Sequence, residues 1–298
     1  MKLKFSLSLT IALGLAQLCS MAGAQTNDTL KKIKETGTIS LGGRDSSIPF
    51  SYTLGAPEPI GYSADLCRKI VEAVKIKLGM PDLKVRYTIV TPTNRIPLVQ
   101  NGTVDLECST TTNTVARQQQ VDFSPSIFMA GVTAAVKKSS GINTFAELGE
   151  KSVATVSGST SIQLLRAYRK AEKTDIAEIH GKDTSEAFLL LASDRAVALV
   201  LEDVQLAGLI ASSPAPGDYK ILRERLRDEP YGFMFRKDDP RFKEIVDQTI
   251  TGLMKSGEIN DIYAKWFTRP VPPNNVNLNF PMSDSVRETY KNPNNKGV

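Results

Sequence analysis

One short stretch of the chain gathers side chains that could hold an anion. Residues 106–120 read LECSTTTNTVARQQQ, so that hydroxyl groups at Thr110 and Thr112 are followed by Arg117. The apolar letters before this run predict a strand, and Asn113 is suited to cap a helix that starts directly after it. The free N–H groups of a helix start favour an anion, and an arginine can bind a carboxylate through two parallel hydrogen bonds. The alternative that involves no ligand is a capped helix with a solvated arginine.

A second strand-to-helix turn repeats this chemistry. The letters VATVSGSTSIQLL predict a strand, a turn through Gly158 and a helix that begins near Thr160. Glycine lets the backbone approach a ligand closely. The turn is not a P-loop, because no Gly-Lys-Ser/Thr follows it. Two such helix starts that face each other would form a cleft suited to an anion.

Short apolar strands alternate with amphipathic helices, which predicts an α/β fold with a mainly parallel sheet. In the first part of the chain, strands are expected over residues 38–43, 83–90 and 104–108, and helices over 63–79 and 94–102. A long helix from Pro240 carries an apolar stripe. The Pro- and Asn-rich tail from Pro270 is expected along the surface.

The order of strands and helices repeats from about residue 133, so we expect two α/β units. The chain crosses between them near 124–132 and again near 225–233, which means that the second unit is inserted in the first. Open α/β sheets bind ligands outside the carboxyl ends of their strands, so the ligand should lie between the units. The predicted limits are 25–131 and 226–298 for domain 1 and 132–225 for domain 2.

The first 24 residues have the pattern of a secretory signal peptide. A basic start and an apolar run over 7–18, too short to cross a bilayer comfortably, precede the small residues Ala22-Gly23-Ala24. Attachment of lipid at Cys19 would need a small residue before it, and Leu18 is not small. We therefore expect cleavage after Ala24 and export to the periplasm.

Composition excludes several classes of protein. The chain has 37 basic and 32 acidic residues, and the predicted leader removes two of the lysines, which leaves a charge too mild to indicate nucleic acid. No CxxC pair is present and His180 is the only histidine, so neither a zinc site nor a Ser-His-Asp triad is expected. We expect no metal and no cofactor.

Two cysteines follow the predicted leader. Cys67 lies in a predicted amphipathic helix and Cys108 in a predicted buried strand. Export would allow them to form a disulfide. We expect instead two separate buried thiols, with the disulfide as the alternative.

Eight segments carry a family resemblance and follow one another in order: GRDSSIPFSY, GYSADLC, TNRIPLVQNGTVDLECSTTTNTVARQ, FSPSIF, SGSTS, DRAVALVLEDVQLAG, YGFMFRKDDP and KWFTRPVPPNNVNLNF. Together they resemble the periplasmic glutamate/aspartate-binding proteins of polar amino-acid ABC transporters, within solute-binding protein family 3. The resemblance implies a two-domain periplasmic-binding-protein fold of type II with a hinged cleft. It also implies an acidic amino acid as ligand and ABC permease subunits as partners. We expect a monomer without enzymatic activity.

The resemblance also implies roles for single residues. Arg117 would hold the ligand α-carboxylate together with Thr112 and Thr160. Arg44 and Arg95 would hold the side-chain carboxylate. An acidic residue at the end of AVALVLED would pair with the α-ammonium.

Four positions depart from the pattern of that family. A pocket serine aligns with Pro92, a second serine with Thr110, a histidine with Thr184, and the ammonium-binding aspartate with Glu202. The groups for the two carboxylates are therefore better retained than the group for the amine. A dicarboxylate without an amine stays an alternative ligand. A dehydratase-like periplasmic enzyme is the alternative function, with Glu202 or the neighbouring Asp203 as acid or base.

Overall fold

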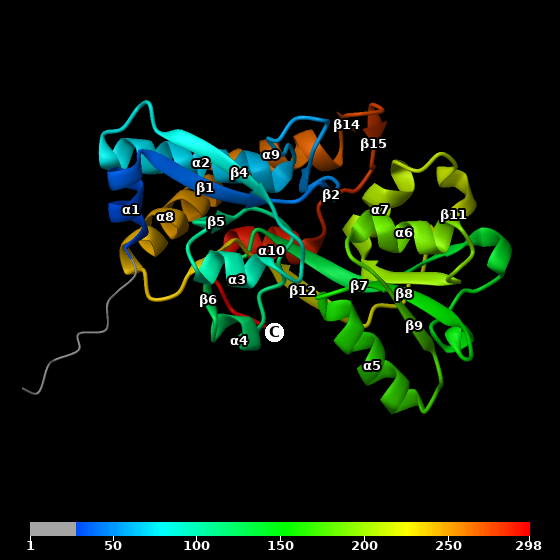
Figure 1. The fold of residues 1–298 in the computed structure, drawn as a ribbon. Coiled ribbons are helices and arrows are strands. Elements are labelled where there is room, and N and C mark those ends of the chain that lie inside the picture. The colour runs from blue at the N-terminus through cyan, green and yellow to red at the C-terminus, as the bar shows by residue number, and fades with distance from the viewer. Residues whose placement is uncertain (1–27) are drawn as a thin grey trace, which may run out of the picture.

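The computed structural model describes residues 28–298, so the predicted signal peptide and its cleavage after Ala24 lie outside the described residues. Within this range no helix is both long and apolar enough to span a bilayer. Two sheets, each with its own helices, make up the fold (Figure 1).

The first sheet has five strands in the order β4–β1–β5–β13–β6. β1 runs parallel to β4 and β5, whereas β13 runs antiparallel to β5 and β6. The strands predicted early in the chain are confirmed, but the sheet is mixed, because the chain returns to it through β13. The strand bounds are β1 Thr38–Gly43, β4 Lys84–Ile89, β5 Leu106–Glu107, β6 Val121–Phe123 and β13 Met234–Arg236.

Helices cover both faces of the first sheet. One face shares a large apolar core with five helices, and the other packs against α3 (Arg95–Gln100). In α2 the buried residues Leu66, Ile70 and Val74 recur at helical spacing, and Gly79 ends the helix in the left-handed region that favours glycine. The five helices are α1 Thr29–Thr36, α2 Tyr62–Leu78, α8 Pro240–Ser256, α9 Glu258–Phe267 and α10 Asp284–Lys291.

The second sheet has the order β11–β7–β10–β8–β9, and β12 also pairs with β7. Every residue of β10 is buried, as expected of a strand covered on both faces. One core on this sheet includes α5 (Thr160–Glu172), and the other includes α6 (Thr184–Ala192) and α7 (Asp203–Ala211). The strand bounds are β7 Phe128–Lys137, β8 Ser152–Val156, β9 Ala177–Gly181, β10 Ala198–Glu202, β11 Tyr219–Ile221 and β12 Arg227–Tyr231.

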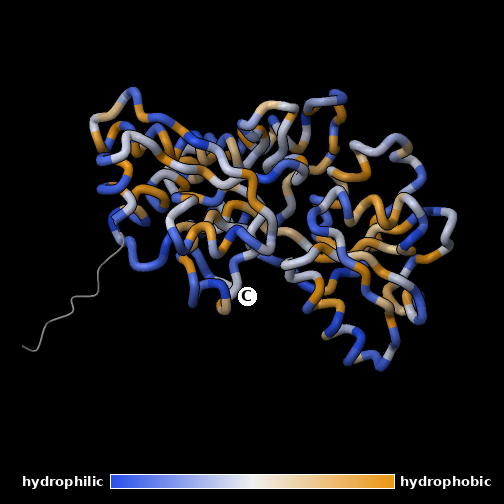
Figure 2. The backbone as a smooth tube through the Cα atoms, in the orientation of Figure 1, coloured by the Kyte–Doolittle hydropathy of each residue, from blue (hydrophilic) through white to orange (hydrophobic). Residues whose placement is uncertain are grey.

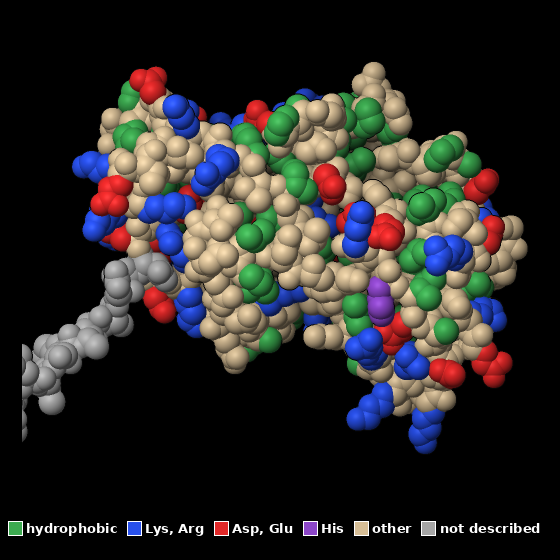
Figure 3. All heavy atoms as spheres, viewed as in Figure 1, with side chains coloured by type: hydrophobic (Ala, Val, Ile, Leu, Met, Phe, Trp, Pro, Cys, Tyr) green, Lys and Arg blue, Asp and Glu red, His purple; other side chains and the backbone are tan. Residues whose placement is uncertain are grey.

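Strands β7 and β12 form an antiparallel pair that runs between the two cores. Phe128 and its partner Tyr231 belong to the core of the first sheet, whereas Val132, at the other end of the pairing, belongs to a core of the second. In Figure 2 the apolar segments gather in two regions, one around each sheet. Figure 3 shows acidic and basic side chains interspersed over one face of the molecule.

Two short two-stranded ladders complete the strands. In each ladder the two strands are antiparallel. Their bounds are β2 Ser46–Ser47 with β3 Ser51–Tyr52, and β14 Pro270–Val271 with β15 Val276–Asn277.

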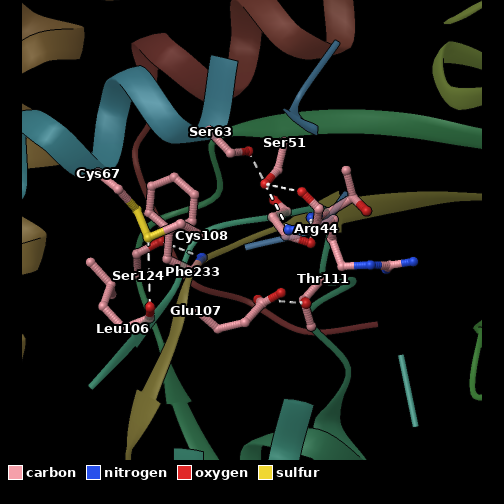
Figure 4. The surroundings of a disulfide bond; sticks show 12 residues. Arg44, Ser51, Ser63, Cys67, Leu106, Glu107, Cys108, Thr111, Ser124 and Phe233 are labelled. Carbon is pink, nitrogen blue, oxygen red and sulfur yellow. Dashed lines mark hydrogen bonds between the residues drawn. A yellow bond between two sulfur atoms is a disulfide. The ribbon is translucent and has the colours of Figure 1, made fainter. Parts of the chain in front are cut away.

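Cys67 and Cys108 form a disulfide, so the expectation of two separate thiols is wrong. Figure 4 shows Cys67 on α2 and Cys108 just beyond β5, with the sulfur atoms bonded between them. The Cα atoms lie 6.1 Å apart, within the range that a disulfide spans. The pairing arises because α2 places Cys67 on the face that packs over the end of β5.

The tail from Pro270 is more than a surface segment, which corrects the expectation from its composition. It contains α10, whose residues Val286, Thr289 and Tyr290 are buried. The hydroxyl groups of Tyr290 and Tyr62 are hydrogen-bonded at 2.6 Å. The tail is therefore anchored in the core of the first sheet.

Candidate ligand-binding site

A cavity lies where the carboxyl ends of strands from both sheets meet. It brings together seven of the eight site residues named from the sequence, and only Arg117 is outside its lining. The first sheet contributes residues that follow β1, β4 and β5, and the second contributes residues at or after the ends of β8, β9 and β10. The lining includes Arg44, Pro92, Arg95, Thr110, Thr112, Ser159, Thr160, Thr184, Leu201, Glu202 and Gln205.

Arg44 follows β1 directly and is almost fully buried, with 2% of its surface exposed. Within residues 28–298, its Nε and Nη2 atoms have no hydrogen-bond partner. Burial, and secondarily the nearby Arg95, lower the pKa of Arg44 to about 10. Buried donors without an acceptor are rare in folded proteins, so this guanidinium is suited to an anion.

Arg95 begins α3 and is also buried, and its Nη1 donates to Thr111 Oγ1 at 2.6 Å. The Thr111 hydroxyl in turn donates to Oε2 of Glu107 at 2.8 Å. Burial lowers the pKa of Arg95, and the charge of Glu107 partly opposes this. Figure 4 shows the hydrogen bond between Glu107 and Thr111, with Arg44 nearby. Two arginines and one buried glutamate leave net positive charge for a single carboxylate.

Neither Glu107 nor Thr111 was named from the sequence. Glu107 lies in β5 and is completely buried, and its Oε1 has no hydrogen-bond partner among the described residues. The available signal was the presence of two acidic residues, Asp105 and Glu107, in the predicted strand VDLEC, because buried carboxylates are costly unless they are paired.

Arg117 lies on α4 (Val115–Gln118), and Thr114, not Asn113 as predicted, is the N-cap. Its Nη1 donates to the carbonyl of Thr112 at 2.8 Å, and its Nη2 donates to the carbonyl of Gly158 at 3.2 Å. The side chain therefore links the two strand-to-helix turns that the sequence singled out. Burial and the neighbouring Arg95 lower the pKa of Arg117 to about 9.

Glu229 is a further site residue that the sequence analysis missed. It lies in β12, is completely buried, and accepts hydrogen bonds at Oε2 from the hydroxyl groups of Thr112 and Thr160, each at 2.7 Å. Its Oε1 accepts from Arg227. A hydroxyl group has one proton to donate, so in this structure both threonines donate to Glu229.

Glu202 ends β10 and is 4% exposed, and its Oε2 accepts from Nε2 of Gln205 at 2.9 Å. Burial, and then the charge of Glu229, raise the pKa of Glu202 to about 7. Its neighbour Asp203 does not line the cavity and instead forms an ion pair with Arg225 at 2.6 Å. Of the two acids at this point, Glu202 is therefore the one that lines the cavity.

The two remaining predicted threonines make contacts across the site. Thr184, at the start of α6, donates from Oγ1 to the carbonyl of Ser46 at 3.1 Å and so connects the second sheet to the first. Thr110 donates to Oε1 of Gln205 at 3.4 Å. Each contact joins a residue of one sheet's part of the chain to a residue of the other's.

Within residues 28–298 no group of three or more His, Cys, Asp and Glu side chains could hold a metal ion. His180 lies in β9, where its Nδ1 is 2.6 Å from the hydroxyl group of Thr155. It does not line the cavity.

Two characterised relatives resemble the chain over most of its length. It is 51% identical over 271 residues to the L-glutamate/L-aspartate-binding protein of Pseudomonas aeruginosa, and this match covers 91% of this chain and 90% of that protein. It is 44% identical over 292 residues to the glutamate/aspartate import solute-binding protein of Escherichia coli K12, and this match covers 98% of this chain and 96% of that protein. Both are named as binding proteins, not as enzymes.

A solved structure shows the same fold with lower identity. It is the ancestral amino-acid-binding protein described as a precursor of cyclohexadienyl dehydratase, with a TM-score of 0.70 and 27% identity over 81% of this chain and 100% of that one. Residues 39–269 match the family model of the bacterial extracellular solute-binding proteins, family 3. The chain therefore belongs to the bacterial extracellular solute-binding proteins of family 3.

Proposed function

We propose that the protein captures glutamate or aspartate in the cavity between its two sheets and delivers it to an ABC importer. The observation that carries this proposal is the set of three arginines, Arg44, Arg95 and Arg117, gathered around one site that also contains Glu202. The arginines offer donors to the two carboxylates of such a ligand, and Glu202 offers an acceptor to its ammonium group. The names of the two relatives support the same ligands.

Each end of the ligand has its own partners in this proposal. Arg44 and Arg95 bind the side-chain carboxylate, for which their buried and unpartnered nitrogen atoms are suited. Arg117, Thr112 and Thr160 bind the α-carboxylate.

Because both threonine hydroxyl groups donate to Glu229, each must rotate toward the ligand for this contact to form. Glu202 pairs with the α-ammonium.

We propose that the chain forms two lobes with the limits expected from the sequence. Residues 25–131 and 226–298 form one lobe, and residues 132–225 form the other. The antiparallel pair β7 and β12 runs between the two cores and is suited to act as the hinge. We also propose that the signal peptide is cleaved after Ala24, that the mature protein acts in the periplasm, and that it works as a monomer.

Titration calorimetry with L-glutamate, L-aspartate, L-glutamine and succinate tests the ligand. We expect heats of binding for the two acidic amino acids, weaker binding of glutamine, and no product when the ligand is recovered and analysed by mass spectrometry. Binding of succinate without any binding of glutamate or aspartate would refute the amino-acid assignment. Conversion of a bound ligand would refute the assignment as a binding protein.

A dicarboxylate without an amine is the second candidate ligand. The observation in its favour is the pKa of Glu202, which at about 7 leaves this residue partly protonated at neutral pH. A protonated carboxyl group can donate a hydrogen bond to an anionic ligand but is a poor partner for an ammonium. The succinate titration in the same panel separates the two candidates.

A further inference from the structure

We infer that residues 295–298 are a positioning segment for the site, because they brace the turn that carries Arg117. This inference rests on the proposed function of Arg117 as a ligand-binding residue. In Figure 1 the C-terminal segment, in red, runs past β6 and ends beside α4. The contacts are specific and join parts of the chain far apart in sequence.

The segment pairs with the turn through its main chain. The N–H of Val115 donates to the carbonyl of Val298, and the N–H of Val298 donates to the carbonyl of Asn113, each at 3.1 Å. These two bonds connect the main chain of the C-terminal segment to the main chain of the turn. They hold the residues on either side of Thr114, which is the N-cap of α4.

Side chains of the turn add two more bonds. The carbonyl of Asn295 accepts from Nδ2 of Asn113 at 2.9 Å and from Nε2 of Gln118 at 2.7 Å. Asn113 precedes α4 and Gln118 is its last residue, so one carbonyl holds both ends of the helix. Gln118 Nε2 also donates to Oδ1 of Asn113, so the two side chains are bonded to each other as well as to Asn295.

Helix α4 needs such a brace because it cannot be stable alone. It has only four residues, of which Val115 and Ala116 are exposed, whereas isolated helices shorter than about 12 residues are marginal in water. Yet Arg117 on this helix must reach both Thr112 and Gly158. A binding residue has to be held within roughly 0.5 Å of its working position by its neighbours.

Gly297 makes the contact possible. A Cβ atom at this position would lie 2.9 Å from the carbonyl carbon of Thr114 and 2.9 Å from the nitrogen of Val115. Both of these are main-chain atoms, which cannot move aside cheaply. A larger residue must therefore push the segment away from the turn.

The test compares Gly297→Val with Gly217→Val in the full chain. Gly217 is exposed, and a Cβ atom there would meet nothing within 4 Å, so it is a matched control. We expect Gly297→Val to weaken glutamate binding about tenfold or more, because small displacements of an orienting group are costly. It should speed amide hydrogen exchange at residues 113–118 while the melting temperature stays close to that of the control.

The outcomes separate this inference from the proposed function. Glutamate binding by the unaltered protein tests the proposed function alone, and amide exchange at 113–118 reports on the brace without any ligand. Unchanged exchange in Gly297→Val, or faster exchange with unchanged glutamate affinity, would overturn the inference. A general loss of stability, with faster exchange throughout the described chain, would also overturn it.

Discussion

At the scale of single residues, Arg117 is the strongest test of the site. Arg117→Ala should weaken glutamate binding by about 2–5 kcal/mol, or roughly 30- to 4000-fold, because it leaves a desolvated carboxylate unpaired. Arg117→Lys should also bind poorly, since a point charge does not replace a planar fork that reaches Thr112 and Gly158 together. Calorimetry measures the affinity, and thermal unfolding checks the fold. Arg241→Ala, at an exposed arginine, is the control, and equal affinity in the Arg117 and control variants would contradict the assignment.

Glu202 should make glutamate binding depend on pH. Its pKa is raised to about 7 in the free protein, and a bound ammonium would lower it, so the affinity should fall as the pH drops below about 7. The limiting slope is about tenfold per pH unit, with release of one proton on binding. Calorimetry in buffers of different ionisation enthalpy measures that proton.

Two variants control the pH experiment. Glu202→Gln should remove the dependence and should weaken glutamate more than succinate, which has no amine. His180→Gln is the second control, because His180 is the only histidine of the chain. It should retain the pH dependence, since His180 lies outside the cavity lining. A dependence that follows His180 would show that another group titrates.

The raised pKa of Glu202 also affects the stability of the free protein, and this effect has the opposite pH dependence to that of ligand affinity. Because the folded state raises the pKa of Glu202, its protonated form favours folding below the unfolded value of about 4.5. That contribution is lost as the pH rises through about 7. Ligand affinity and the stability of the free protein should therefore move in opposite directions across this range.

At the scale of elements, the disulfide joins α2 to the end of β5, directly before the hydroxyl run. It closes a loop with a sequence separation of 41 residues, and removing such a bond costs about 2–4 kcal/mol. The double variant Cys67→Ala, Cys108→Ala should therefore melt roughly 5–10 °C lower than the oxidised protein. A reductant should lower the melting temperature of the unaltered protein and leave that of the double variant unchanged. Equal melting temperatures for the oxidised protein and the double variant would show that the bond adds no stability.

At the scale of the whole molecule, we expect the ligand to draw the two sheets together. Its proposed partners lie on both sides. Arg44 and Arg95 follow strands of the first sheet, whereas Thr160 begins α5 after a strand of the second sheet and Glu202 ends β10. A ligand that contacts both sides favours the closed form by its additional closed-state contacts. Small-angle scattering should show a smaller radius of gyration with saturating glutamate. Thr160→Ala should bind more weakly and compact less, and an unchanged radius in the unaltered protein would exclude closure.

The sequence by itself determined the features that depend on neighbouring residues. The apolar periodicity of α2 and α8, the unbroken apolar run of β10 and the turn at Gly158 all follow from short-range steric and hydrophobic preferences. Arg117 and Thr160 were singled out because each occurs where a predicted strand gives way to a predicted helix. Such signals depend only on neighbouring residues, so they can be recognised without knowledge of the fold.

Only the tertiary structure decided which distant groups meet. The bond between Cys67 and Cys108, the position of Glu229 between Thr112 and Thr160, and the brace at Asn113 each depend on how helices and strands pack. Asn113 and Asn295 are 182 positions apart, and the hydroxyl group of Thr112 is 117 positions from its acceptor. No local pattern encodes such contacts, because their geometry is set by the packing of elements whose positions a single sequence does not reveal.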